Sequence, residues 1–202
     1  TAGVKVVPAD IRNPEAVCDF VKEVDGIVNL AFDRQSAEAT ETALATALIA
    51  AMAGTDKVLV WTSGVGVTGS SGAGVLDEDA PLQLGGTVGW RASCESLVVS
   101  AAERGVRSVV IRPPMVHDGD HSAVLGLFKV AVGDDDAVPY PGDGEHVWST
   151  VHVDDLADLY VRALERAAAG TVYIGASDSY VRVKDLARYV SSRIGLEGRT
   201  QP

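Results

Sequence analysis

Short runs of β-branched residues alternate with longer, alanine-rich stretches along this chain. The runs have the length of buried strands, and the longer stretches place apolar residues at helical spacing. Leu44, Leu48 and Ala51 fall on one helical face, and Gly54 follows where that helix should end. The pattern predicts strands at 4–7, 26–30, 58–61, 108–111, 147–151 and 172–174, and helices at 14–23, 36–53, 88–104, 122–132, 155–168 and 183–194.

Strands that alternate with helices favour βαβ units and a parallel sheet. The sequence therefore predicts an α/β fold with a doubly wound parallel sheet. Its 202 residues suffice for one domain with a sizeable core. Residues 62–86 carry many Gly, Ser and Asp, and a loop of that length in a compact domain usually has a function.

Composition narrows the classes of partner and the compartment. A net charge of −11 argues against nucleic acid or an anionic membrane as a partner, since both need a basic surface. The apolar runs stay well below the roughly 18 residues of a membrane helix, and the first residues lack the pattern of a signal peptide. Cys18 and Cys94 have no spacing suited to zinc, which favours two reduced thiols in the cytoplasm.

Five segments follow one another as VVPADIRNPEAV, DGIVNLAF, KVLVWTSGVGVTG, GVRSVVIRPPMV and STVHVDDLADLYVRAL. In this order they resemble the extended short-chain dehydrogenase/reductases of the NAD(P)-dependent epimerase/dehydratase family. The resemblance implies a Rossmann-like domain that binds NAD or NADP and a small C-terminal substrate-binding portion. It assigns 1–114 together with 147–168 to the dinucleotide-binding domain, and 115–146 with 169–202 to the substrate-binding portion.

The resemblance also implies which residues meet the cofactor. In the family, the carboxylate at the Asp10 position accepts from the adenine amino group, and the apolar residue at the Ile11 position packs on the adenine ring. The end of the next strand passes beneath the cofactor, and a turn after a later strand meets the nicotinamide amide. The implied cofactor-binding residues are Asp10, Ile11, Leu30, Ala31, Phe32, Thr62, Arg91, Pro113, Pro114 and Val116.

The family's glycine-rich phosphate turn has no match here. That turn should join a first strand to a helix whose N-terminus holds the pyrophosphate, whereas this sequence starts at what resembles the third strand. The glycines of 64–69 lie in the turn of the catalytic serine instead. We expect the missing elements to precede residue 1, because a sheet without its first two strands would expose an apolar edge. Otherwise the domain cannot bind a dinucleotide in the usual way, and the strand that separates NAD from NADP binders is missing as well.

The second departure concerns catalysis. Family enzymes use a Tyr as general acid/base, four residues before a Lys whose charge helps the Tyr to ionise. Alignment on Glu95 places Arg91 at the Lys and Thr87 at the Tyr, and a shifted register places Trp90 near the Tyr. An alcohol is too weak an acid and indole only donates. Arg91 can bind a ribose or a carbonyl but cannot shuttle a proton.

The remaining polar candidates lie in turns and in a late strand. At the serine turn, Gly64 takes the place of the family's Ser and Ser63 stands one position earlier. His117 is the best-matched proton donor, because an imidazole normally titrates near neutral pH. No metal site is predicted at 117–121, since Gly119 disfavours the helix that histidines four apart would need. The predicted catalytic residues are Ser63, Thr87, Arg91 and His117, and the predicted substrate-binding residues are His117, Trp148 and His152.

The sequence thus predicts an NAD(P)-dependent oxidoreductase or epimerase/dehydratase with a degenerate Ser-Tyr-Lys site, acting on a nucleotide sugar or another carbonyl or alcohol. Two alternatives stay open: a dinucleotide-binding sensor or partner-binding module without turnover, and a relic that binds nothing. The resemblance further implies a homodimer, in which helices 36–53 and 88–104 pair with their copies.

Overall fold

The computed structural model describes residues 3–70, 72, 74–84, 88–118, 122, 126, 128, 130–132 and 136–202. Contacts between residues divide the chain into two compact units. The first comprises 1–112 and 160–173, and the second comprises 113–159 and 174–202. Each unit has its own sheet and its own buried core.

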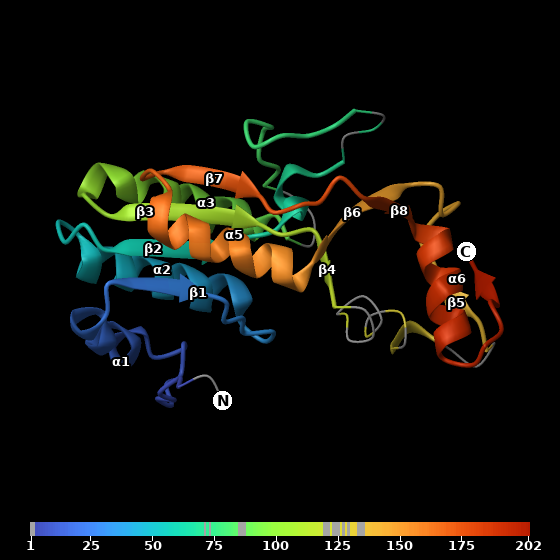
Figure 1. Ribbon diagram of the computed structural model, residues 1–202, viewed down its shortest axis with the longest axis horizontal. Helices are drawn as coiled ribbons and strands as arrows, with labels where there is room; N and C mark the ends of the chain where they lie inside the picture. The colour runs from blue at the N-terminus through green and yellow to red at the C-terminus, as the bar shows by residue number, and fades with distance from the viewer. Residues whose placement is uncertain are drawn as a thin grey trace. The chain divides into compact units, whose positions relative to one another are not determined.

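A four-stranded sheet forms the centre of the first unit, with the strand order β1-β2-β3-β7 (Figure 1). Its strands are β1 (Gly26–Asn29), β2 (Val58–Thr62), β3 (Arg107–Arg112) and β7 (Thr171–Ile174). β1 pairs with β2 and β2 with β3, both in parallel. The predicted α/β fold with a parallel sheet is confirmed.

Helices cover both faces of this sheet, as a doubly wound fold requires. In Figure 1, α2 and α3 lie behind the sheet and α5 crosses in front of it. The helical elements are α1 (Pro14–Cys18), η1 (Asp19–Glu23), α2 (Ala37–Met52), η2 (Val65–Thr68), α3 (Trp90–Ser100), η3 (Ala101–Arg104) and α5 (Val153–Arg166), whose residues from Tyr160 onward belong to the first unit.

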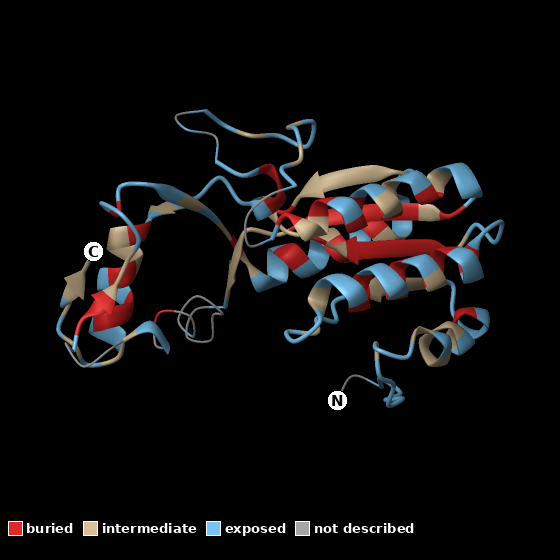
Figure 2. Ribbon diagram, turned by 180° about the vertical axis from the view of Figure 1, so that it is seen from behind, coloured by how far each residue is buried: buried red, intermediate tan, exposed pale blue. Residues whose placement is uncertain are grey.

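The core of the first unit is centred on β2, which has buried residues from Val58 to Trp61 (Figure 2). Side chains alternate between the two faces of a strand. Leu59 and Trp61 accordingly share a cluster with the buried side chains of α2, among them Leu44 and Leu48. The apolar stripe that predicted α2 is therefore the face that packs against the sheet.

The predicted strand at 4–7 is wrong: residues 4–10 have no regular secondary structure, and Val4 and Val6 are 77% and 84% exposed. In a doubly wound sheet of order 3-2-1-4, the third strand bonds to the second and never to the fourth. The resemblance implies that residues 4–7 correspond to the third strand and β1 to the fourth, so the free edge of β1 is not the edge that residues 4–7 would pair with. These residues therefore have the composition of a strand without the pairing of one.

The second unit contains two small sheets, with the orders β4-β6-β8 and β5-β9. Its core includes Phe128, Val138 and Val183. The helix predicted at 122–132 is described only at 122, 126, 128 and 130–132, of which 126, 128, 130 and 131 are helical. The predicted division into dinucleotide-binding and substrate-binding parts remains a prediction. The elements of this unit are β4 (Met115–His117), β5 (Val138–Pro139), β6 (Val147–His152), β8 (Tyr180–Arg182), α6 (Val183–Arg193) and β9 (Thr200–Gln201).

Among the described residues, no helix combines the length and the apolar character that crossing a bilayer would demand.

Candidate functional site

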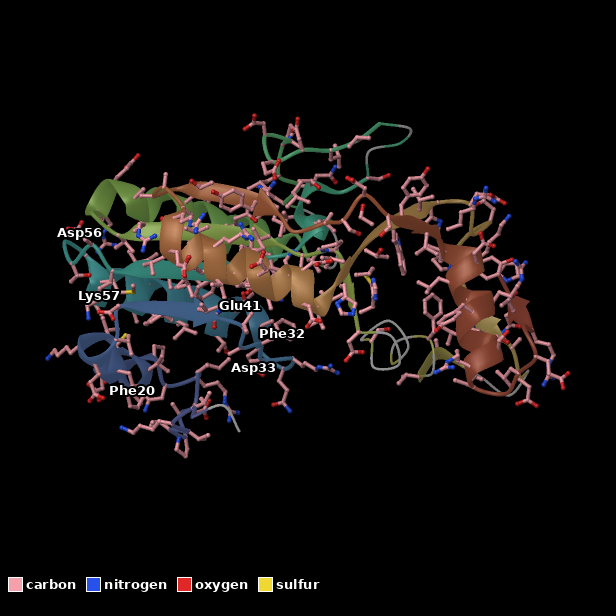
Figure 3. All side chains as sticks on the ribbon, in the orientation of Figure 1. Phe20, Phe32, Asp33, Glu41, Asp56 and Lys57 are labelled. Carbon is pink, nitrogen blue, oxygen red and sulfur yellow. The ribbon has the colours of Figure 1, made fainter. Side chains whose placement is uncertain are left out.

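The carboxyl end of the first unit's sheet exposes apolar side chains. Ligands of open α/β sheets bind outside the carboxyl ends of the strands. Leu30 and Phe32, which follow β1 at this end, are 66% and 49% exposed. Figure 3 labels Phe32 and Glu41 at this end of the sheet, and Lys57 at the opposite end. The exposed surface after β1 therefore lies where the fold places a ligand.

Arg91 is held beside this surface by four neighbours. Its Nη1 donates to the backbone carbonyl of Ser63 at 2.8 Å, and its Nη2 lies 3.6 Å from Glu41 Oε1. Its Cζ lies 5.1 Å from the ring centroids of both Phe32 and Trp90, within the range of a cation–π contact. These five residues, Phe32, Glu41, Ser63, Trp90 and Arg91, are called the Arg91 cluster below.

The two aromatic rings of the Arg91 cluster are nearly parallel. The Phe32 and Trp90 centroids lie 6.4 Å apart, with an interplanar angle of 15°. Phe32 comes from the segment after β1, and Trp90 is the first residue of α3. The cluster thus joins β1, β2, α2 and α3 at one end of the sheet, and it offers a cation and flat apolar faces together.

Glu41 is the unusual member of the cluster, because its carboxyl group is buried within α2. Burial raises its pKa to about 6, since desolvation of the carboxylate outweighs the attraction of Arg91. A carboxyl with a raised pKa in the folded state contributes stability below its ordinary pKa of 4.5. That contribution is lost as the pH rises through about 6.

The Ser63 hydroxyl is buried, and among the described residues its Oγ has no hydrogen-bond partner. The Ser63 backbone is fully engaged: its N–H donates to the carbonyl of Ile111 at 2.8 Å, and its carbonyl accepts from Arg91. A direct role of Ser63 on a substrate therefore remains a prediction. Thr87, aligned with the family's Tyr, lies outside the described residues.

Cys94 lies beneath the cluster on α3 and carries an unreactive thiol. Its Sγ donates to the backbone carbonyl of Glu41 at 3.8 Å. Burial raises the pKa of the thiol to about 12, and burial also raises the pKa of Cys18. Because the thiolate is the nucleophilic form, Cys94 is not a candidate nucleophile near neutral pH.

A buried ion pair joins the middle of α3 to the end of β3. Arg112 Nε and Nη2 donate to Glu95 Oε1 at 3.0 and 2.5 Å, and both side chains are at most 3% exposed. Arg112 Nη1 also donates to the backbone carbonyl of Glu78 at 3.1 Å. The pair therefore links β3, α3 and the acidic part of the long loop.

Two of these carboxylates were recognisable in the sequence, although we assigned them no role there. Glu41 shares the apolar helical face of Leu44 and Leu48, which follow it by three and seven residues. Glu95 falls one residue after buried Cys94. A carboxylate at an apolar position of a helix signals a buried charge, because such charges are almost always paired.

The segment at 10–12 fits a nucleotide only in part. Ile11 packs against the core, and together with Phe32 and Arg34 it lines an open hollow of about 380 Å³. The Asp10 carboxylate accepts from the backbone N–H, Nε and Nη2 of Arg12, which lowers the pKa of Asp10. The apolar faces of Ile11 and Phe32 suit an adenine ring, whereas an adenine amino group would share the Asp10 carboxylate with Arg12.

The other predicted cofactor residues are distributed over both units. Thr62 Oγ1 lies 2.6 Å from the Tyr160 hydroxyl, so the two residues share a hydrogen bond within the first unit. Burial raises the pKa of Tyr160, and the bond to Thr62 opposes that rise. Pro113, Pro114 and Val116 belong to the second unit and are half-buried.

In the second unit, His117 and His152 face each other from paired strands. They are partners in the register of β4 and β6, and their rings meet edge-on at 5.5 Å. His152 Nδ1 accepts the backbone N–H of Asp154 at 3.2 Å and lies 3.6 Å from the Asp154 carboxylate. Trp148 packs beside Phe128, with centroids 6.3 Å apart. These contacts give His152 and Trp148 structural partners, and their roles on a substrate remain predictions.

Within the described part of the chain, no group of three or more His, Cys, Asp or Glu side chains is arranged to hold a metal ion. His121 lies outside that part.

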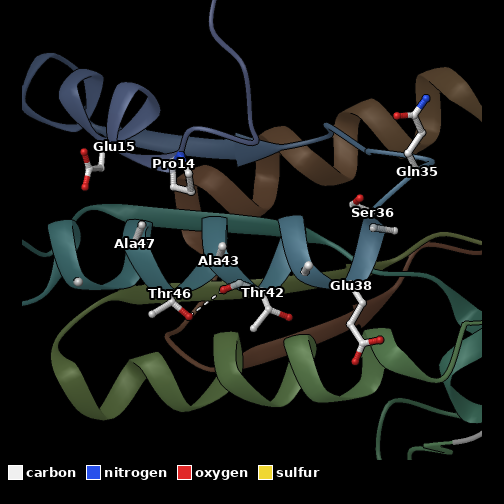
Figure 4. Close-up of a pocket in the computed structure, with 12 residues that line it drawn as sticks. Pro14, Glu15, Gln35, Ser36, Glu38, Thr42, Ala43, Thr46 and Ala47 are labelled. Atoms are coloured by element: carbon white, nitrogen blue, oxygen red, sulfur yellow. Dashed lines mark hydrogen bonds between the residues drawn. The ribbon is translucent and has the colours of Figure 1, made fainter.

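An open groove of about 1050 Å³ follows the outer face of α2 (Figure 4). Small side chains on α2 form much of its wall, and Thr46 Oγ1 donates there to the carbonyl of Thr42. Pro14 and Glu15 of α1 line its far side. This groove lies on one of the two helices expected to pair in a dimer.

The sequence and the fold were compared with known proteins. A family model described as the NAD dependent epimerase/dehydratase family matches residues 1–175. An uncharacterized protein of Schizosaccharomyces pombe, C2A9.02, is 30% identical over 189 residues, which cover 87% of this chain and 61% of that protein. The chain thus spans about three fifths of the length of this relative.

Solved structures share the fold at low identity. A dTDP-glucose 4,6-dehydratase from Bacillus anthracis, in complex with NAD, has a TM-score of 0.78 and 22% identity over 94% of this chain and 63% of its own. The UDP-glucose 4-epimerase of Thermus thermophilus, also in complex with NAD, has a TM-score of 0.76 and 19% identity over 100% of this chain and 73% of its own. At these identities the likeness establishes the fold alone.

Proposed function

The chain belongs to the NAD-dependent epimerase/dehydratase family, and on that premise we propose that it binds NAD or NADP and uses it on a nucleotide sugar or another carbonyl or alcohol. The Arg91 cluster carries the proposal. It places a fixed cation beside exposed apolar surface at the carboxyl end of the sheet, where the fold binds its ligands.

Three further observations support dinucleotide binding. Structures of the same fold were solved with NAD bound, among them the B. anthracis dehydratase and the T. thermophilus epimerase. The hollow lined by Ile11 and Phe32 offers apolar faces for a planar ring. The exposure of Leu30 and Phe32 agrees with a surface that a ligand covers.

The bound dinucleotide would supply hydride transfer. The chain's own residues would bind and orient the reactants. Leu30, Ala31 and Phe32 would give an apolar floor, and Arg91 would donate to a ribose hydroxyl or to the carbonyl oxygen of a substrate. Arg91 stays protonated and moves no proton, so proton transfer falls to another group, for which His117 is our candidate.

One observation favours the alternative, a dinucleotide-binding module without turnover. Within the Arg91 cluster, the Ser63 hydroxyl is buried and the charge of Arg91 is matched by Glu41. A site of this kind can hold a ligand firmly while it offers no exposed acid or base. A redox-ratio sensor or a partner-binding subunit would need nothing more.

We expect Arg91→Met to weaken dinucleotide binding about 10- to 100-fold, because a hydrogen bond from a charged donor contributes about 1.5–3 kcal/mol. The measurement is calorimetric titration of the protein at its natural full length with NAD(H) and NADP(H). The matched control is Arg104→Met, which removes an exposed arginine of η3 and should leave the affinity unchanged.

Turnover separates the two candidate functions. Oxidation of the reduced dinucleotide in the presence of nucleotide sugars or a panel of carbonyl compounds would support the enzyme. Binding without oxidation across that panel would support the module. If the wild-type protein binds neither dinucleotide, both candidates fail.

We also propose that the protein is a homodimer that pairs through α2 and α3. The outer face of α2, with Ala43 and Ala47 in its groove, suits the close approach of another helix. Ala43→Arg should convert a dimer into a monomer in light scattering, because it puts a buried charge into the interface. The control Val75→Arg alters a residue that is 99% exposed in the loop. A wild-type monomer at micromolar concentration would contradict the proposal.

A further inference from the structure

Burial of the Glu41 carboxylate costs desolvation free energy, and the carboxylate has a charged partner. Its carboxylate is 3% exposed and lies at a position of α2 that otherwise faces the core. A buried charge is retained against its desolvation only where it is paired. Its charged partner is Arg91, 3.6 Å away on α3, whose side chain is 20% exposed.

The neighbours of Arg91 leave its guanidinium little freedom. Ser63 fixes one nitrogen through its carbonyl, and Phe32 and Trp90 approach the group from two sides. A carbonyl and two aromatic rings carry no net charge, so these three contacts alone would allow a lysine or an arginine to adopt several orientations. Glu41 supplies the charged contact, an ion pair at 3.6 Å that draws the guanidinium toward α2.

We propose that Glu41 is a positioning residue: from within α2 it holds the Arg91 guanidinium against the Phe32 and Trp90 rings, so that a dinucleotide or its carbonyl partner meets a fixed cation. The inference rests on the proposed function for the identity of the ligand. The hold of Glu41 on Arg91 is a property of the chain alone and can be measured without any ligand.

This role makes the site sensitive to pH. The titratable groups that face Glu41 are Arg91 and the Cys94 thiol, both on α3. The charged residues of α1 and η1, which also pack against α2, are exposed: Glu15, Asp19, Lys22 and Glu23. Since the pKa of Glu41 is about 6, acidification below neutral pH neutralises it and releases Arg91. A ribose hydroxyl or a carbonyl is neutral, so its binding depends more on the orientation of Arg91 than on the net charge of the site.

The test compares Glu41→Gln and Glu41→Asp with Glu38→Gln, a control that changes an exposed carboxylate of the same helix. The first readout needs no ligand: the side-chain Nε–H signal of Arg91 in nitrogen-15 NMR, assigned by its loss in Arg91→Lys. In the wild type this signal should shift with a midpoint near pH 6. In Glu41→Gln it should stay at one position and resemble that of an exposed arginine, and Glu41→Asp should restore part of the shift.

The second readout is the affinity for NADH and NADPH between pH 5.5 and 8. At pH 8, Glu41→Gln should bind about 5- to 10-fold more weakly than the wild type, and its affinity should not change with pH. Wild-type affinity should fall as the pH decreases through 6. The variant should meanwhile unfold at the same or a higher urea concentration than the wild type at pH 8, which separates positioning from a loss of structure.

The outcomes separate this inference from the proposed function. An Arg91 signal that is unchanged in Glu41→Gln overturns the inference. So does a variant that binds dinucleotide as well as, or better than, the wild type while Arg91→Met binds poorly, and the proposed function then stands. If the wild type binds neither dinucleotide, the proposed function fails, and the NMR titration alone decides whether Glu41 positions Arg91.

Discussion

Replacing Arg112 by methionine is expected to lower the free energy of unfolding by about 3–5 kcal/mol, because it leaves a buried carboxylate without its partner. Glu95 is 1% exposed and accepts from Arg112 at 2.5 Å. Because Glu95 is buried, water does not replace the hydrogen bonds that Arg112 donates to it. The variant also loses the bond from Arg112 to the carbonyl of Glu78 and should free that part of the loop.

Urea unfolding followed by circular dichroism measures this loss. Arg166→Met, which breaks an exposed ion pair to Glu165, should change the free energy by less than about 0.5 kcal/mol. Adding Glu95→Met to Arg112→Met should recover a large part of the stability, since apolar residues of similar volume often replace a buried pair at no net cost. A single variant as stable as the wild type would show that the pair is not buried as described.

The second large effect is expected at Trp61. It is 1% exposed at the centre of β2 and packs with Leu44 and Leu48 of α2. Trp61→Ala removes the largest side chain of this core and leaves a cavity, so the free energy of unfolding should fall by about 3–5 kcal/mol.

Thermal unfolding measures this effect, with Trp61→Phe as a graded variant that should lose less because its ring refills part of the space. Val75→Ala is the control: the residue is 99% exposed, and its truncation should matter by less than about 0.5 kcal/mol. Equal midpoints for Trp61→Ala and the wild type would contradict the packing between β2 and α2.

Local patterns in the sequence predicted most elements of the first unit. The helix at 36–53 is found as α2 at Ala37–Met52, and Gly54 follows it with a φ of 69°, as a residue after a helix end requires. The strands at 26–30, 58–61 and 108–111 are found within one or two residues of their predicted bounds. These features depend on contacts between residues near in sequence, where spacing alone carries the information.

The predicted strand at 4–7 shows that a local pattern alone does not make a strand. Its valines have the composition of a strand, but a strand forms only against a matching edge, and residues 4–7 do not pair with the free edge of β1. The helix predicted at 155–168 is found as α5 at Val153–Arg166. Its pattern did not show that α5 passes from the second unit to the first at Tyr160.

The sequence by itself determined the family and the parallel sheet, because these follow from ordered motifs and short-range spacing. The placement of Arg91 where the family has a Lys remains a prediction. Only the tertiary structure decided what surrounds Arg91. Phe32, Glu41 and Ser63 come from separate segments up to 59 residues away in sequence and meet it through packing of the sheet against α2 and α3. Residues that meet through packing have no characteristic spacing in the sequence. A buried carboxylate such as Glu41 gains its role only from the charge that folding places beside it.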